Sequence, residues 1–323
     1  MTAVAPSERS AAAPPYRGRF APTPSGPLHL GSLLTALAGW LQARTAGGRW
    51  LLRLDDLDAA RSRPQHADAI LQQLEAHALH WDEAPRYQSQ HLAEYADAFQ
   101  RLRAAGRVYA CTCTRAQLAR DSIAAVDGAV YAGTCRDAAR PAARAAWRLR
   151  AGDGTLALHD RWRGELRRDV ARDIGDFVVW RADGTPGYQL ACVVDEDAQR
   201  ITEVVRGTDL IGSSLRQLLL QRLLGLASPD YLHLPVLTGA DGRKLSKQNH
   251  AAPVSAVAAG ANLLQCLALM NQAPPAALRG GTPAEVLKWA TSHWNPHALP
   301  QAAQIPVAAP PAEHGAAAAH LAS

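Results

Sequence analysis

The sequence is poor in lysine and in cysteine, and each shortage narrows what the protein can be. Only Lys244, Lys247 and Lys288 occur among 34 basic residues, so the other 31 are arginines. A single arginine is therefore weak evidence for a site, whereas two lysines within four residues are informative. The five cysteines are an odd number, which argues against a disulfide framework. They are Cys111, Cys113, Cys135, Cys192 and Cys266.

Long hydrophobic runs are absent as well. The longest apolar stretch, residues 254–270, is interrupted by Asn262 and Gln265 and is too short and polar to span a membrane. Residues 1–15 are rich in alanine, proline and serine and lack the apolar segment of a signal peptide. We therefore expect a cytoplasmic protein with no membrane partner.

Length and composition are those of a globular protein. A chain of 323 residues allows one large domain or about two, with a core that needs no disulfides. Hydrophobic residues make up 48% and charged residues 20%, which argues against a disordered chain. The net charge of +5 permits a nucleic-acid partner without requiring one.

The order of the expected elements indicates an α/β fold. Short apolar runs predict strands, and apolar residues at helical spacing predict helices between them. The expected strands are 17–21, 50–54, 176–180, 201–206 and 232–237, and the expected helices are 32–43, 66–80, 92–105 and 213–224. This alternation implies βαβ units and a parallel sheet.

The chain divides into one main domain and shorter segments. Residues 16–253 form the predicted domain, and within it 107–147 replace long helices by cysteines and polar turns, which predicts a small inserted fold. Residues 254–300 are expected to be a short helical region. The Ala/Pro-biased segments 1–15 and 301–323 are expected to be tails.

The first chemical motif runs from Arg19 to Ser32 as RFAPTPSGPLHLGS. A strand leads into a turn, and a helix begins at or just after His29. Helix N-termini bind phosphate, Gly31 permits close approach of a ligand, and His29 can donate to a developing phosphate charge. Taken alone, the motif also fits a proline-rich loop before an ordinary helix cap.

The second motif is Lys244-Leu245-Ser246-Lys247, which follows Gly242. Two cations in a mobile loop suit a polyphosphate that is gripped only during reaction. A solvated surface turn is the alternative. The scarcity of lysine elsewhere in the chain favours the phosphate interpretation.

Together the two motifs resemble the "HIGH" and "KMSKS" signatures of class I aminoacyl-tRNA synthetases. The segments RLDDLD at 53–58, GYQLA at 187–191, VVD at 193–195 and VRGTDL at 205–210 resemble the glutamyl branch of that family, and the likeness spans about 17–249. It implies a Rossmann-like parallel-sheet catalytic domain. Ser32 replaces the second histidine of "HIGH", and Leu245 replaces the methionine of "KMSKS".

The resemblance implies a set of site residues. His29, Lys244 and Lys247 would be catalytic, and ATP would be bound by Pro22, His29, Gly31, Ser32, Lys244, Ser246 and Lys247, with Mg²⁺ accompanying the ATP. L-glutamate would be bound by Arg19, Phe20, Ala21, Pro22, Thr23, Asp55, Tyr188 and Arg206. Arg19 would pair with a substrate carboxylate, because a guanidinium gives a bidentate contact. Asp55 stands where the family has the glutamate that binds the substrate ammonium, and it is shorter by one methylene.

Cys111, Cys113 and Cys135 predict a zinc site, because three thiols within a short span of a reducing-compartment protein are a typical ligand set. From chemistry alone the fourth ligand would be water or Tyr131. The resemblance favours Tyr131, since C-x-C…Y-x₃-C looks like the zinc insertion of glutamyl-tRNA synthetase paralogues. The site is expected to be structural. Cys192 and Cys266 are expected to be buried apolar cysteines.

Only 76 residues follow Lys247, so we expect no anticodon-binding domain of ordinary size. The resemblance to short glutamyl paralogues implies that glutamate is activated to glutamyl-adenylate and then attached to queuosine at the wobble position of tRNA(Asp). The protein is expected to act as a monomer. The alternatives are a truncated synthetase that charges a tRNA 3′ end, a small-molecule adenylating enzyme, and a non-catalytic zinc protein that binds tRNA.

Overall fold

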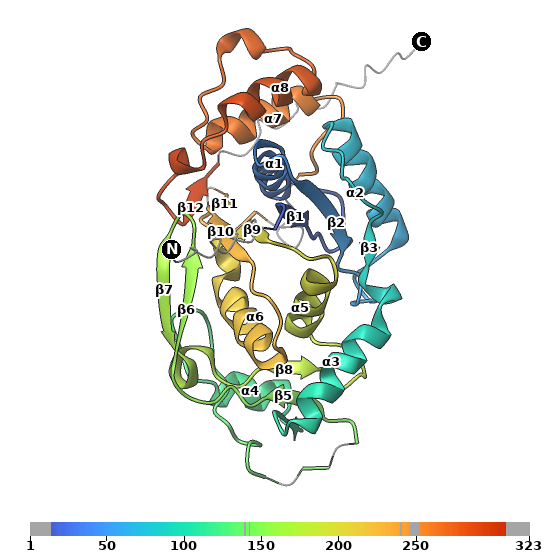
Figure 1. Ribbon diagram of the computed structural model, residues 1–323, viewed down its shortest axis with the longest axis vertical. Coiled ribbons are helices and arrows are strands. Elements are labelled where there is room, and N and C mark those ends of the chain that lie inside the picture. The colour runs from blue at the N-terminus through green and yellow to red at the C-terminus, as the bar shows by residue number, and fades with distance from the viewer. Residues whose placement is uncertain (1–13, 139, 142, 240, 246–251, 308–323) are drawn as a thin grey trace, which may run out of the picture.

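A twisted sheet forms the centre of the protein (Figure 1). The computed structural model describes residues 14–138, 140–141, 143–239, 241–245 and 252–307. Seven strands follow in the order β3-β2-β1-β9-β10-β6-β7. Their bounds are β1 Arg17–Phe20, β2 Arg49–Leu54, β3 Arg86–Tyr87, β6 Thr155–Asp160, β7 Gly164–Asp169, β9 Glu203–Gly207 and β10 Asp230–Leu234.

The first five strands of that order run parallel, as the sequence predicts. Strand β6 joins β10 through one parallel bridge, and β7 pairs with β6 in an antiparallel hairpin. The strand order reverses between β1 and β9. In sheets of this kind, ligands bind beyond the carboxyl ends of the strands at such a switch point.

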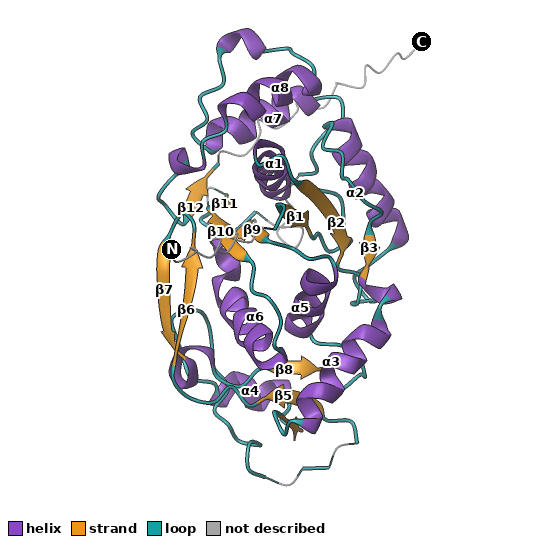
Figure 2. Cartoon of the chain, in the orientation of Figure 1, coloured by secondary structure: helices purple, strands orange, loops and turns teal. Residues whose placement is uncertain are grey.

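Helices cover both faces of the sheet (Figure 2). Their bounds are α1 Leu30–Thr45, α2 Pro64–Ala76, α3 Leu92–Ala104, α5 Tyr188–Ala198 and α6 Ile211–Leu224. Apolar side chains of α1, among them Leu33, Leu37 and Leu41, are fully buried beside Trp50 and Leu52 of β2. Each such side chain stabilises the fold by about 1.5–3 kcal/mol relative to exposure.

The cysteine-bearing insertion forms a second, antiparallel sheet with the order β4-β5-β8. Its strands are β4 Val108–Cys111, β5 Ala146–Leu149 and β8 Val178–Trp180, and helix α4, Arg115–Asp121, follows β4. The strand expected at 176–180 therefore exists but belongs to this sheet and not to the parallel one. Trp147 of β5 pairs with Trp180 of β8, and both rings pack on Phe99 of α3.

The last part of the chain packs against α1 at one end of the molecule, and the small sheet lies at the other end (Figure 1). It contains α7, Ala259–Leu269, and α8, Pro283–His293. The strand expected at 232–237 is divided by Pro235, which has no N–H to donate, into β10 and β11, Val236–Thr238. Strand β12, Gln304–Pro306, pairs with β11, although it lies in a segment expected to be a tail.

The sequence analysis missed the β6–β7 hairpin altogether. Among the described residues, no helix is long and apolar enough to cross a membrane.

Candidate active site

A cavity opens at the carboxyl ends of β1, β9 and β10, where α1 begins. This is the place that the switch point of the sheet predicts. The cavity brings together nine residues that the sequence analysis assigned to ATP or glutamate, from segments far apart in the chain. They are Arg19, Phe20, Ala21, His29, Gly31, Ser32, Tyr188, Arg206 and Lys244.

His29 caps helix α1 in a reciprocal arrangement with Ser32. The backbone N–H of Ser32 donates to Nδ1 of His29 at 3.3 Å, and the backbone N–H of His29 donates to Oγ of Ser32 at 2.9 Å. Because Nδ1 accepts, a neutral His29 ring carries its proton on Nε2. A side chain at Gly31 would begin 3.2 Å from the His29 ring, so glycine leaves room for that ring.

The structure describes only the first part of the second motif, Lys244-Leu245-Ser246-Lys247. Lys244 donates to Oδ2 of Asp209 at 2.5 Å, and both side chains line the cavity. Asp209 lies in the short 3-10 turn after β9. Ser246 and Lys247 lie outside the described residues, so their roles stay predictions.

Arg19 and Arg53 are held by acidic side chains of their own chain. Arg19 is 5% exposed and donates to Oε1 of Glu196, on α5, at 3.0 Å and 3.2 Å. Arg53 is 1% exposed and donates to both carboxylate oxygens of Asp55, at 2.6 Å and 3.3 Å. Burial raises the pKa of Asp55, and the Arg53 guanidinium opposes that rise.

Asp55 was expected to bind the substrate ammonium, and its carboxylate accepts hydrogen bonds from Arg53, on the strand that ends just before it. It lines a second, neighbouring cavity together with Thr23. Tyr188 lines both cavities, so the two sites share a wall. Pro22 lines neither, and its carbonyl accepts the backbone N–H of Asp55 at 3.0 Å.

Arg206 lies at the carboxyl end of β9 and is 4% exposed. Its Nη2 donates to Oγ of Ser214 at 2.6 Å and to Oε1 of Gln217 at 2.7 Å. Its Nη1 is buried and has no hydrogen-bond partner among the described residues. A buried, unpaired N–H group of a cation is costly, so Arg206 is suited to an anionic ligand.

Several cavity residues were not assigned from sequence. Arg53 and Asp209 lie within segments quoted for the resemblance, and Gly207 follows Arg206 directly. A Cβ on Gly207 would stand 2.4 Å from Oδ1 of Asp209 and 2.9 Å from Val236, so only glycine fits there. Arg53, Gly207 and Asp209 stand at or shortly after the end of an expected parallel strand, and this position could have identified them as site residues.

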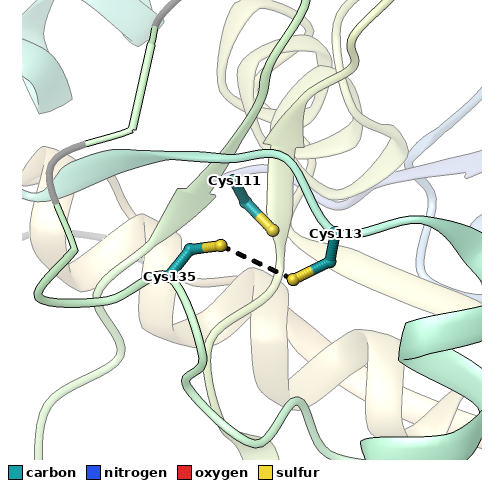
Figure 3. Close-up of side chains that lie close together, drawn as sticks. All are labelled: Cys111, Cys113 and Cys135. Atoms are coloured by element: carbon teal, nitrogen blue, oxygen red, sulfur yellow. Dashed lines mark hydrogen bonds between the residues drawn. The ribbon is translucent and has the colours of Figure 1, made fainter.

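The four predicted metal ligands lie together in the inserted fold, and Figure 3 shows the three cysteines among them. The sulfur atoms of Cys111, Cys113 and Cys135 all lie within 4.8 Å of one another. The hydroxyl of Tyr131 is 3.6 Å from the sulfur of Cys111 and 3.3 Å from that of Cys113. These spacings fit one ion, because tetrahedral bonds of about 2.3 Å place sulfur ligands roughly 3.8 Å apart.

The surroundings act in opposite directions on two of the thiols, and burial raises the pKa of Cys113. Burial acts to raise the pKa of Cys135, but hydrogen bonds from a backbone N–H and from Tyr131 outweigh it and lower the pKa to about 6. Nε of Arg148 donates to the sulfur of Cys111 at 3.3 Å. The Arg148 guanidinium also lies 3.9 Å from the centre of the Tyr131 ring. Cys192 and Cys266 are buried elsewhere, as expected.

Two relatives that are similar in sequence over most of this chain carry the same name. The Glutamyl-Q tRNA(Asp) synthetase of Methylococcus capsulatus is 50% identical over 297 residues, which is 91% of this chain and 96% of that protein. The Glutamyl-Q tRNA(Asp) synthetase of Chromobacterium violaceum is 49% identical over 286 residues, covering 88% and 95%.

Solved structures share the fold. A glutamate tRNA ligase from Elizabethkingia meningosepticum superimposes with a TM-score of 0.71 at 24% identity, covering 90% of this chain and 66% of that one. Residues 16–274 match the model of the family "tRNA synthetases class I (E and Q), catalytic domain". The chain therefore belongs to the class I glutamyl- and glutaminyl-tRNA synthetases and, within them, to the glutamyl-Q tRNA(Asp) synthetase family.

Proposed function

We propose that the protein activates L-glutamate with ATP and transfers the glutamyl group to queuosine at the wobble position of tRNA(Asp). This proposal rests on one cavity, which is lined by residues of the two ATP motifs, at the start of α1 and at Lys244, and by buried guanidinium groups. Relatives that share about half of their residues with nearly the whole chain bear the name of this activity.

In the first step, an α-carboxylate oxygen of glutamate attacks the α-phosphorus of ATP. A new P–O bond forms, the bond to the bridging oxygen of the leaving group breaks, and pyrophosphate departs. Nε2–H of His29 donates to phosphate oxygens as charge builds up on them, and Lys244 with Lys247 attracts the polyphosphate. Mg²⁺ bound with the ATP supplies further charge neutralisation. The reaction depends on positioning and needs no protein nucleophile.

The two cavities offer groups for both ends of glutamate. Arg206 offers the buried Nη1, which has no hydrogen-bond partner among the described residues, and Arg19, which donates to Glu196, lines the same cavity. A guanidinium binds a carboxylate with two parallel hydrogen bonds. Asp55, which lines the neighbouring cavity, and Tyr188, which lines both, would bind the ammonium group, with Arg53 limiting the freedom of the Asp55 carboxylate.

In the second step, a hydroxyl of the queuosine ring attacks the acyl carbon of glutamyl-adenylate. An ester forms, and AMP leaves with the oxygen of the mixed anhydride. We further propose that the protein works as a monomer. The cytoplasm supplies its ATP and tRNA.

The inserted fold would hold one structural Zn²⁺ through Cys111, Cys113, Tyr131 and Cys135. The spacing of the three sulfur atoms and the Tyr131 hydroxyl supports four ligands and no open position. Such an ion would fix the turn between β4 and the loop that carries Tyr131.

The test is a labelling assay. The protein is incubated with labelled glutamate, ATP and Mg²⁺, and with tRNA(Asp) that either contains or lacks queuosine. We expect label only on the queuosine-containing tRNA and its loss when periodate first cleaves the queuosine diol. Labelling of tRNA(Glu), or of tRNA(Asp) without queuosine, would contradict the proposal and favour charging of a 3′ end.

A further inference from the structure

Arg206 is the last member of a chain of buried polar side chains that begins in a different part of the sheet. The chain runs from Asp160, at the end of β6, through His233 on β10 and Ser214 on α6 to Arg206 on β9. We infer that Asp160, His233 and Ser214 are positioning residues that orient the Arg206 guanidinium for the carboxylate of glutamate. The inference rests on the proposed function.

The links of the chain are short and buried. Oδ2 of Asp160 lies 2.7 Å from Nδ1 of His233, and Nε2 of His233 lies 2.6 Å from Oγ of Ser214. Oγ of Ser214 accepts from Nε of Arg206 at 3.1 Å and from Nη2 at 2.6 Å. None of the four side chains belongs to a residue more than 4% exposed.

The placement of protons follows from the partners. Although burial opposes its ionisation, hydrogen bonds from His233 and from backbone N–H groups hold the pKa of Asp160 below its usual range. Burial lowers the pKa of His233, which favours a neutral ring. The carboxylate then selects the tautomer with the proton on Nδ1, and Nε2 accepts the Ser214 hydroxyl proton.

This proton arrangement leaves the lone pairs of Ser214 for Arg206. The Arg206 guanidinium donates to this one oxygen through two of its nitrogens, Nε and Nη2, and therefore has little freedom to rotate. Gln217 restricts it further by accepting from Nη2. The remaining nitrogen, Nη1, is buried without a partner in the described part of the chain. Arg206 lines the cavity, so this nitrogen is kept for an anion that arrives there.

A Ser-His-Asp chain also invites comparison with a nucleophilic triad. Here the serine is fully buried and does not line the cavity, and its oxygen accepts hydrogen bonds from Arg206. A nucleophile must reach the substrate and must be free to attack. The chain is therefore suited to holding a charge in place and not to covalent catalysis.

The decisive variant is Ser214→Ala, which removes the oxygen that holds Arg206 together with its contacts to His233 and to the carbonyl of Leu210. Glutamate-dependent ATP–pyrophosphate exchange is measured with each substrate varied in turn. We expect the KM for glutamate to rise about 10- to 100-fold, as for a lost hydrogen bond to a charged group, while the KM for ATP changes less than twofold. Ser214→Thr, which keeps the hydroxyl, restores the KM for glutamate to within about threefold of the original.

Asp160→Asn tests the far end of the chain. Asp160 accepts from the backbone N–H groups of Trp162 and Arg163 on Oδ1, and from the backbone N–H and the ring of His233 on Oδ2. An amide has one acceptor oxygen and cannot serve both sets, so the tautomer of His233 is no longer enforced. The same selective rise in the KM for glutamate is expected. The matched control is His77→Asn, because His77 is a second fully buried histidine that links α2 to Asn262 on α7. It is expected to lower the melting temperature without changing the KM for glutamate.

The outcomes separate clearly. An unchanged KM for glutamate in folded Ser214→Ala, an equal rise in both KM values, or the same selective rise in His77→Asn would overturn the inference. A ¹⁵N imidazole spectrum of the unmodified protein gives a test that needs no variant. It should show His233 neutral with its proton on Nδ1, and a charged ring or the other tautomer overturns the chain. If the unmodified protein shows no exchange with glutamate, the proposed function fails as well.

Discussion

The cavity on the parallel sheet and the cysteine cluster on the inserted sheet differ in whether their buried polar groups have hydrogen-bond partners. In the cavity region, Nη1 of Arg53, Nη1 of Arg206 and Oε2 of Glu196 are buried without hydrogen-bond partners in the described part of the chain. In the cluster, the thiols and the Tyr131 hydroxyl contact one another and Arg148. The first region is built to receive a ligand that comes and goes, and the second is built to stay closed.

The two regions also differ in what holds them. Cavity residues are supplied by β1, β9, β11 and α1, so their relative positions depend on elements from across the main domain. The cluster residues lie on β4 and in the loops after it, and β5 contributes Arg148. A change in the cavity should therefore alter substrate binding, whereas a change in the cluster should alter the local fold.

The largest expected effect is that of Arg206→Ala on the cavity side. Loss of a bidentate, charge-assisted contact should lower kcat/KM for glutamate-dependent pyrophosphate exchange by about 100-fold or more. Arg167→Ala is the control, because Arg167 lies exposed on β7 and should leave exchange unchanged. A fall of less than about fivefold in Arg206→Ala would remove this arginine from the site.

Next in size is the effect of Cys113→Ser on the cluster. We expect metal content, measured by plasma mass spectrometry, to fall from about one zinc per chain to nearly none, with a clear drop in melting temperature. The KM for glutamate should stay within about threefold. Cys266→Ala is the matched control, since Cys266 is fully buried outside the cluster and should leave metal content intact. Equal metal content in both variants would break the contrast between the regions.

Arg148→Met sharpens the comparison within the inserted fold. It removes the donor to Cys111 and the cation over the Tyr131 ring, so zinc affinity in chelator competition should fall about 10- to 100-fold. Arg150→Met serves as the control, because Arg150 lies over Tyr109 and makes no described contact with a thiol. Similar zinc affinities in the two variants would show that Arg148 does not support the ion.

The smallest effect lies outside both regions. Glu83 accepts from Arg17 and Arg49, and these hydrogen bonds lower its pKa to about 2 from an ordinary value of 4.5. The stabilisation is therefore complete above about pH 4.5 and is lost as the pH falls toward 2. Because the pair is near the surface, Glu83→Gln should cost at most about 1 kcal/mol. Urea unfolding at pH 7 and pH 3 should show this difference shrinking at the lower pH, and a constant difference would contradict it.

Local signals predicted the parts of the fold that are decided locally. Strand β2 followed from a short apolar run, and the start of α1 followed from the turn before His29. The pairing of strands was harder to predict, because an apolar run does not show which sheet the strand joins. Residues 176–180 were assigned to the wrong sheet for this reason. In the hairpin that was missed, β7 is rich in charged residues, and β6 offers only the short alternation of Leu156 and Leu158.

The site shows the same limit. The family resemblance selected residues that the structure brings together, including Arg19, Tyr188 and Arg206. It did not show that Arg53, on β2, would donate to the carboxylate of Asp55, which directly follows that strand. Nor did the sequence connect Asp160 with His233, which are 73 positions apart and meet only when β6 and β10 become neighbours.

Strand β11 has a consequence for the place where the Lys244 loop begins. On one side, β11 pairs with β12 along three residues, and it also holds the described part of the loop through a hydrogen bond from the N–H of Leu245 to the carbonyl of Leu237. The backbone beside Lys244 is thus tied to a strand that the last described segment braces. A change in β12, which is far from the cavity in sequence, would therefore shift Lys244 against the cavity wall that Leu237 forms.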